Sequence, residues 1–135
     1  MIGIVLITHG NLAEEMLSAV KFVLSGEPAV KMVGVSLDPT KEFDTFKKII
    51  QSAIKSVDNG DGILLVTDMF GGTPSNIGLT FLEENKIEVI SGVNLPMLLK
   101  LSTIKENVTL QEAIKIAEKA GRDNIIVASK LLDNN

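Results

Sequence analysis

Short apolar segments rich in β-branched residues alternate along this chain with longer amphipathic segments, and this alternation restricts the fold more than any other feature of the sequence. Residues 2–8 and 62–68 are the clearest of the apolar segments, because each is almost continuously apolar. Runs of this kind are typical of strands that are buried on both faces, as in a parallel sheet. We predict further strands at residues 31–36, 87–91 and 125–128.

Between these strands, apolar residues recur at helical spacing. Thr109 and Glu112 also have the spacing of a capping box. Strands and helices therefore alternate from end to end, which predicts an α/β fold with a doubly wound, mostly parallel sheet flanked by helices. The predicted helices extend from Leu12 to just before Gly26, from Thr40 to Val57, from after Asn76 through Leu82, from after Pro96 to about Leu101, and from after Thr109 to Gly121, which is expected to end the last helix.

The length of the chain and the lack of an internal boundary predict one domain, residues 1–135. Of its 135 residues, 45% are hydrophobic, which is enough for one well-packed core, and no linker, repeat or low-complexity segment divides them. The apolar segment at residues 1–8 has no basic residue before it and is too short to span a membrane. We therefore expect a cytoplasmic protein without a targeting segment.

Two residue types narrow the chemistry. The chain has no cysteine, which excludes disulfides, thiolate nucleophiles and zinc–thiolate or iron–sulfur centres. It has a single histidine, His9, which excludes a metal centre built from several histidines of one chain. We predict that the protein uses neither a metal ion nor a cofactor. A net charge of -4 and aromatic residues that are all Phe provide no basic patch and few stacking surfaces, so nucleic acid is not an expected partner.

Polar residues follow the first and third predicted strands where each strand ends. Thr8, His9 and Gly10 end the first strand, and Asp68 ends the third. The carboxyl ends of parallel strands share one edge, so His9 and Asp68 can meet if these strands are neighbours. A carboxylate on one ring nitrogen fixes the imidazole tautomer and leaves the other nitrogen free to act as a nucleophile. The alternatives are a histidine that binds a backbone carbonyl and an aspartate that caps a helix or turn.

The breaker-rich loop at residues 69–76 is the next candidate element. Gly71 and Gly72 would let backbone N–H groups approach an anion at the start of a helix, and Thr73 would add a hydroxyl donor. The alternative is a plain turn with Pro74 in the first helical turn. Neither a Walker loop nor a dinucleotide fingerprint is present, so a small phosphoryl group fits better than a nucleotide. No G-x-S-x-G elbow supports a serine triad, and no Trp or Tyr supports a flavin site.

Three motifs stand in the order and spacing of a known family: Ile-Thr-His9-Gly10, the segment from Asp68 to Asn76, and the segment from Gly92 to Met97. With them the chain resembles, over nearly its whole length, the mannose-type (mannose/fructose/sorbose superfamily) enzyme IIA component of the bacterial phosphoenolpyruvate-dependent sugar phosphotransferase system. The resemblance implies that His9 takes a phosphoryl group from the phosphocarrier protein HPr. His9 would then pass the group to a histidine of a IIB protein, for sugar uptake and phosphorylation.

The resemblance also implies roles for other parts of the chain. Asp68 would be the partner of the His9 ring, and Gly10 and the loop Gly71-Gly72-Thr73 would hold the phosphoryl group. A homodimer would form by exchange of a C-terminal edge strand, with residues 125–130 paired to a second subunit. Met69 and Phe70 are the first candidates for partner docking, and their alternative role is packing within the loop.

Two positions depart from the family pattern. Family members often carry Trp where this chain has Phe70 and Ser where it has Thr73, and both changes keep the chemical type, so they bear on partner preference rather than on the reaction. The chain ends at Asn135, which leads us to expect IIB on a separate polypeptide and contact with the membrane only through transporter components. Two other readings stay open: a regulatory or dihydroxyacetone-kinase-type phosphotransfer domain that does not act in transport, and a small-anion binding domain without turnover.

Overall fold

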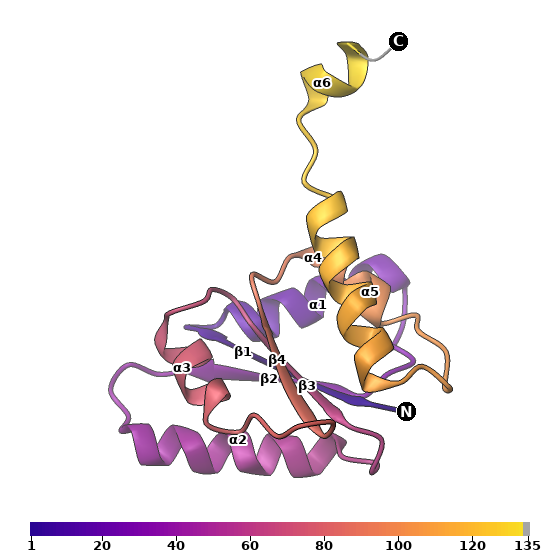
Figure 1. Cartoon of the computed structure of the whole chain (residues 1–135). Helices are drawn as coiled ribbons and strands as arrows, with labels where there is room; N and C mark the ends of the chain where they lie inside the picture. The colour runs from indigo at the N-terminus through magenta and orange to yellow at the C-terminus, as the bar shows by residue number, and fades with distance from the viewer. Residues whose placement is uncertain (134–135) are drawn as a thin grey trace.

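The computed structural model describes residues 1–133 and has the predicted α/β architecture (Figure 1). The described strands are all parallel and lie in the order β2-β1-β3-β4. The strands are β1 (Gly3–His9), β2 (Met32–Leu37), β3 (Ile63–Thr67) and β4 (Ile87–Ser91), and the helices are α1 (Leu12–Leu24), α2 (Phe43–Val57), α3 (Thr73–Leu79), α4 (Leu95–Leu101), α5 (Leu110–Asp123) and α6 (Ala128–Asp133).

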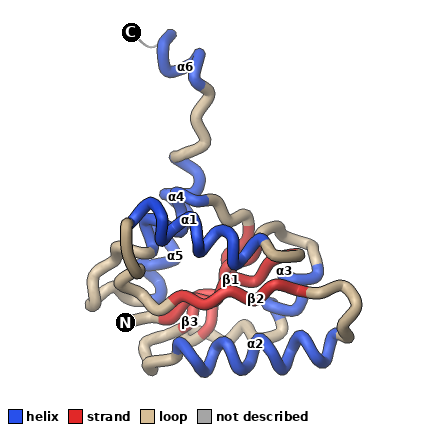
Figure 2. The backbone as a smooth tube through the Cα atoms, turned by 180° about the vertical axis from the view of Figure 1, so that it is seen from behind, coloured by secondary structure: helices blue, strands red, loops and turns tan. Residues whose placement is uncertain are grey.

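Helices cover both faces of the sheet, since successive side chains of a strand point to opposite faces. Helices α1, α4 and α5 lie on one face, and α2 and α3 lie on the other (Figures 1 and 2). In β1, Ile4 and Leu6 belong to the first core and Val5 and Ile7 to the second, and all four are fully buried. Both faces of β1 are therefore apolar, which explains why its sequence is a continuous apolar run.

The chain changes its winding direction at β1. From β1 it crosses through α1 to β2 on one side, and it then returns through α2 to β3 on the other side of β1. In doubly wound sheets, ligand sites lie outside the carboxyl ends of the two strands where the winding reverses. His9 ends β1 and Asp68 directly follows β3, so the fold places both residues at this switch point.

Several predicted helix boundaries are wrong. Helix α2 begins at Phe43 rather than at Thr40, and α3 ends at Leu79 rather than at Leu82. Helix α3 begins at Thr73 rather than after Asn76, because Pro74 is accommodated in its first turn. Gly121 does not end α5, which continues to Asp123. A Cβ atom at Gly121 would lie 2.9 Å from Cε of Met97, so glycine serves here to let α5 pack closely against α4.

The strand predicted at residues 125–128 is not formed within the single chain. Residues 125–127 are irregular, α6 begins at Ala128, and this end of the chain extends away from the domain in Figure 1. A strand needs a neighbour for its backbone hydrogen bonds, and no described strand pairs with this segment. The large apolar side chains of this segment and of α6 are exposed: Ile125, Ile126, Val127, Leu131 and Leu132.

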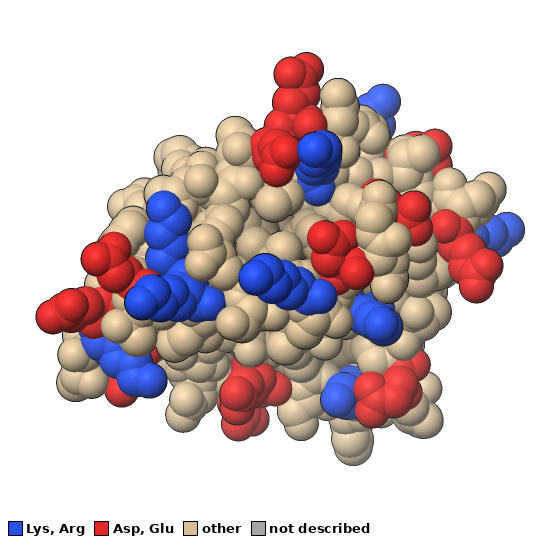
Figure 3. Space-filling model, turned by 90° about the horizontal axis from the view of Figure 1, so that it is seen from below, with Lys and Arg blue, Asp and Glu red and all other residues tan. Residues whose placement is uncertain are grey.

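The surface on the α2 side of the molecule carries charges of both signs. Lys and Arg side chains are interspersed there with Asp and Glu, as Figure 3 shows from below. Nucleic-acid-binding surfaces are instead dominated by basic residues. Within residues 1–133, no helix combines the length and the apolar character needed to cross a membrane.

Candidate functional site

The side chains of His9 and Asp68 meet at the carboxyl edge of the sheet. The Nδ1 atom of His9 lies 2.8 Å from Oδ2 of Asp68, and the backbone N–H of His9 donates to the same oxygen at 3.0 Å. The other carboxylate oxygen, Oδ1, accepts the backbone N–H of Met69 at 3.0 Å. Parallel pairing of β1 with β3 brings together these two residues, which are 59 positions apart in the sequence. The predicted pair is therefore formed.

The carboxylate of Asp68 is held in its ionised form. Burial raises the pKa of Asp68, but hydrogen bonds from the backbone and ring of His9 and from Met69 outweigh this effect and keep the pKa below its ordinary value. An ionised acceptor beside Nδ1 favours the imidazole tautomer that carries its proton on Nδ1. The Nε2 atom of His9 then keeps its lone pair, and 51% of the His9 side chain is exposed, against 13% for Asp68. This geometry provides an accessible nitrogen nucleophile.

The β3–α3 loop lies against the His9 ring. A Cβ atom at Gly72 would lie 2.8 Å from Cε1 and 3.2 Å from Nε2 of His9, so any side chain there would displace the imidazole. Gly71 has a φ of +85°, a conformation that favours glycine, and a Cβ there would meet open space. The two glycines thus have different roles. Gly71 permits the turn, and Gly72 permits the close contact with the histidine.

Buried and half-buried hydroxyl groups fix the ends of the strands. The sequence predicts Thr8 at a strand end, but it does not predict the contacts of these hydroxyl groups. Thr8, which is fully buried, accepts the backbone N–H of Ala13 at 2.7 Å and so caps the first turn of α1. The hydroxyl of Thr67 lies 2.6 Å from that of Ser91, which is in turn 3.4 Å from the hydroxyl of Ser75 in α3. A threonine shortly before a helix is the sequence signal for the first contact. The second requires knowledge of the strand pairing.

A recess of about 460 Å³ opens beside His9 on the α2 side of the sheet. Thr73 lies in its wall, as do Gly10 and the basic residue Lys41. Most of the remaining wall is apolar and comes from the end of β2, the following loop and the start of α2: Leu37, Pro39, Phe43 and Phe46. Sequence reasoning missed these residues, because the motifs contain none of them and only the pairing of β1 with β2 brings them to His9.

The other residues predicted for this site lie around the same edge. Gly10 follows His9 with a φ of +54° and leads into α1. Met69 and Phe70 are 55% and 75% exposed, so neither packs into the core. All predicted site residues are thus grouped at the carboxyl edge of β1 and β3. Among residues 1–133, no group of three or more His, Cys, Asp or Glu side chains is arranged to hold a metal ion.

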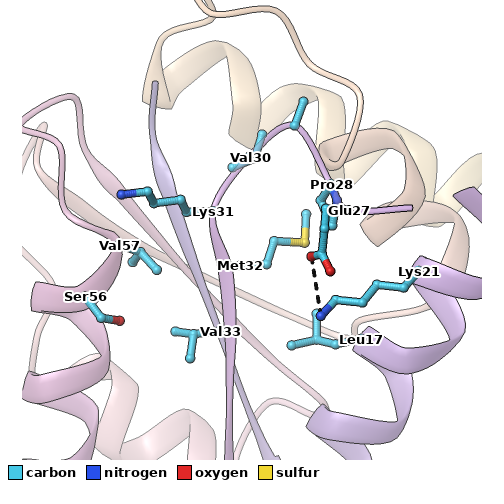
Figure 4. Close-up of a pocket in the computed structure, with 11 residues that line it drawn as sticks. Leu17, Lys21, Glu27, Pro28, Val30, Lys31, Met32, Val33, Ser56 and Val57 are labelled. Carbon is cyan, nitrogen blue, oxygen red and sulfur yellow. Dashed lines mark ion pairs between the residues drawn. The ribbon is translucent and has the colours of Figure 1, made fainter. Parts of the chain in front are cut away.

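A separate hollow of about 350 Å³ lies between α1, the edge strand β2 and α2 (Figure 4). Lys21 and Glu27, which form an ion pair of 3.4 Å, line it together with Lys31 and Met32. These residues surround the amino end of β2, whereas His9 stands at the carboxyl end of the neighbouring strand. The hollow is therefore distinct from the site at His9.

Comparison with known proteins gives a consistent result. A family model, EIIA-man, described as "PTS system fructose IIA component", matches residues 3–118. The "PTS system fructose-specific EIIA component" of Bacillus subtilis (strain 168) is 23% identical, over 98% of this chain and 90% of its own length. The "PTS system mannose-specific EIIAB component" of Escherichia coli (strain K12) is 28% identical over 92% of this chain, which spans only 38% of that protein. A crystal structure of phosphotransferase system component EIIA from Streptococcus agalactiae superposes with a TM-score of 0.82 at 25% identity, covering 96% of this chain and 99% of that one.

Proposed function

The chain belongs to the EIIA-man family of phosphotransferase-system IIA components, and from that premise we propose that His9 is the residue that carries the phosphoryl group. The donor would be the phosphorylated histidine of HPr, and the acceptor would be a histidine of a IIB protein that phosphorylates sugar during transport. The observation that carries this proposal is the contact of 2.8 Å between Nδ1 of His9 and the Asp68 carboxylate, which leaves Nε2 as the exposed nucleophile.

The proposed reaction is an in-line transfer between two imidazoles. The lone pair of Nε2 forms the new bond to phosphorus, while the phosphorus–nitrogen bond of the donor breaks and its electron pair stays on the donor ring. The proton on Nδ1 remains with His9, where Asp68 stabilises the positive charge that develops on the ring. Such a transfer depends mainly on positioning and on stabilising the charge of the equatorial oxygens.

Backbone N–H groups would supply part of that charge stabilisation. The first N–H groups of a helix have no partner within the helix, and α1 begins at Leu12, three residues after His9. The N–H of Ala13 is already bound by Thr8, so its neighbours in this turn would serve. Thr73 faces the same recess as His9 and would add its hydroxyl. The close approach of Gly72 to the ring would let the β3–α3 loop contribute in the same way.

Met69 and Phe70 are the proposed contacts to the partner proteins. Both directly follow Asp68 in the sequence, and both are more than half exposed, at 55% and 75%. An apolar surface next to the reacting nitrogen would bury well against a partner whose own histidine must approach His9 closely. Because HPr is a cytoplasmic phosphocarrier in this family, the exchange would take place in the cytoplasm.

A homodimer is the proposed assembly. The edge strand β4 pairs with β3, and a shallow hollow of about 170 Å³ beside β4 is lined by Ile90 and Ile125 among others. The exposed apolar residues 125–127 would form the predicted strand once a second subunit provides a partner edge. Sedimentation tests this: we expect a dimer for the wild type and a monomer for Ile126→Glu, with Lys55→Gln, an exposed lysine of α2 outside residues 125–130, as a control. A monomeric wild type would contradict the proposal.

The phosphoryl-carrier role is tested by incubating the protein with phosphoenolpyruvate, enzyme I and HPr. We expect one acid-labile phosphoryl group on the wild type and none on His9→Ala. His9 is the only histidine of the chain, so any phosphohistidine found on it identifies the site. Lack of phosphorylation of the folded wild type would sink the proposal. Onward transfer to a IIB protein then separates a transport component from a regulatory domain.

A further inference from the structure

The recess beside His9 has one basic side chain in its wall, Lys41, which none of the sequence motifs includes. The apolar part of the wall includes Leu37 and Phe46, which are only 6% and 5% exposed. Lys41 is itself an exposed residue, and it lines the same recess as His9, so its side chain can reach an anion carried by the histidine.

Local hydrogen bonds hold Lys41 at this position. The carboxylate of Asp38 accepts the backbone N–H of Thr40 at 2.9 Å and its hydroxyl at 2.7 Å. The backbone N–H of Lys41 donates to the carbonyl of Asp38 at 3.1 Å. The turn begins directly after Leu37, whose partner in the parallel ladder is His9. Strand pairing thus fixes the lysine-bearing loop next to the histidine.

The ammonium of Lys41 is available for a ligand. No described residue forms an ion pair with it, whereas Lys21, Lys86 and Lys119 are each paired with a carboxylate. The nearby carboxylate of Asp38 is engaged by Thr40, and these hydrogen bonds, with a smaller contribution from Lys41, lower the pKa of Asp38. Lys41 therefore stands beside a fixed carboxylate without being tied to it.

Within the described part of the chain, the wall of the recess contains no acidic side chain. Among the residues that line the recess, Lys41 is the only Lys or Arg. A phosphoryl group on His9 would therefore find one Lys and no carboxylate among the residues of this wall, so Lys41 can have a large effect on its stability.

We propose that the Lys41 ammonium contacts the phosphoryl group on His9 and acts as a catalytic residue of the transfer, an inference that rests on the proposed function. Lys41 stays protonated throughout and donates hydrogen bonds to the equatorial oxygens as phosphorus passes from the donor nitrogen to Nε2 of His9. The same contact stabilises the phosphorylated state between the two transfers, since it neutralises part of the charge that the group brings.

The test compares Lys41→Gln and Lys41→Arg with Lys48→Gln, an exposed lysine of α2 that does not line the recess. With phosphorylated HPr as donor, we expect kcat to fall about ten-fold or more in Lys41→Gln. Lys41→Arg should keep most of the rate, and Lys48→Gln should match the wild type.

A second measurement uses the isolated phosphoprotein, in which no partner is present. A phosphorus NMR titration should give a higher pKa for the phosphoryl group of Lys41→Gln than for that of the wild type, because a nearby cation favours the more highly charged form. A change in KM for phosphorylated HPr with the same kcat and the same titration would make Lys41 a partner contact and overturn the proposal.

Different results would contradict the role of Lys41 and the phosphoryl-carrier function of the protein. A wild type that is phosphorylated normally, together with unchanged kinetics and titration in Lys41→Gln, overturns the role of Lys41 alone. A folded wild type that takes no phosphoryl group overturns the proposed function and the role of Lys41 with it.

Discussion

One carboxylate oxygen of Asp68, Oδ2, binds both the ring Nδ1 and the backbone N–H of His9, at 2.8 Å and 3.0 Å. The two contacts together fix the position of the main chain and the rotation of the imidazole at the end of β1. The remaining oxygen, Oδ1, is held by the N–H of Met69, so the carboxylate cannot turn away from the ring without losing a hydrogen bond.

Asp68→Asn should slow phosphorylation of His9 by ~100-fold while the protein stays folded, because a neutral amide no longer selects the tautomer with a free Nε2 or stabilises a cationic ring. Rates of transfer from phosphorylated HPr measure the effect, and circular dichroism checks the fold. Glu106→Gln, in the exposed loop between α4 and α5, is the matched control for loss of one carboxylate. Equal rates for Asp68→Asn and the wild type would remove Asp68 from the mechanism.

Asp68 should also make stability depend on pH. Its pKa in the folded protein is lower than in the unfolded chain, so its contribution is complete above the ordinary aspartate value of about 3.9 and is lost as the pH falls through the lower folded value. We therefore expect the difference in free energy of unfolding between wild type and Asp68→Asn to shrink as the pH falls from about 5 to below about 4. Urea denaturation across this range measures it. A difference that stays constant down to the acid limit would contradict the lowered pKa.

The two glycines of the β3–α3 loop should respond differently to alanine. Gly72→Ala places a methyl group 2.8 Å from Cε1 of His9 at an ordinary backbone φ of -84°, so we expect loss of most phosphorylation with little loss of stability. Gly71→Ala meets open space at a φ of +85°, so it should cost about 1–2 kcal/mol of stability without pushing the ring. Transfer kinetics and urea denaturation of both variants test this. Similar kinetic losses in the two would argue against a contact specific to Gly72.

The sequence predicted the elements that depend on local pattern and the residues that stand where strands end. His9 and Asp68 could be placed because buried strands are visible as apolar runs and their ends as sudden polar residues. The recess could not be predicted in this way. Lys41 and Phe43 belong to a loop and a helix start that carry no motif, and only the register of β2 against β1 brings them to His9.

The strand predicted at residues 125–128 shows a second limit of local pattern. Ile125, Ile126 and Val127 have high β-propensity, but a strand forms only where another strand offers hydrogen bonds. In the single chain these residues are instead 75%, 57% and 51% exposed. Gly121 shows again that tertiary packing can override a local signal. Glycine often ends a helix, but Gly121 lies within α5, because a larger residue there would clash with Met97.

Thr8 connects the fold to the site, and Thr8→Val should affect both. The hydroxyl of Thr8 accepts the N–H of Ala13 at 2.7 Å, and both residues are fully buried, so valine leaves this donor unpaired with nearly the same volume. We expect a loss of about 1–2 kcal/mol in the free energy of unfolding. Because the first turn of α1 begins only three residues after His9, its loosening should also slow phosphorylation. Thr8→Ser keeps the hydroxyl and loses a methyl group, so it should lose about 1 kcal/mol of stability but retain the wild-type rate. If both variants kept the full rate of phosphorylation, the position of the start of α1 would not matter for transfer. The proposal that N–H groups of α1 stabilise the phosphoryl group would then be wrong.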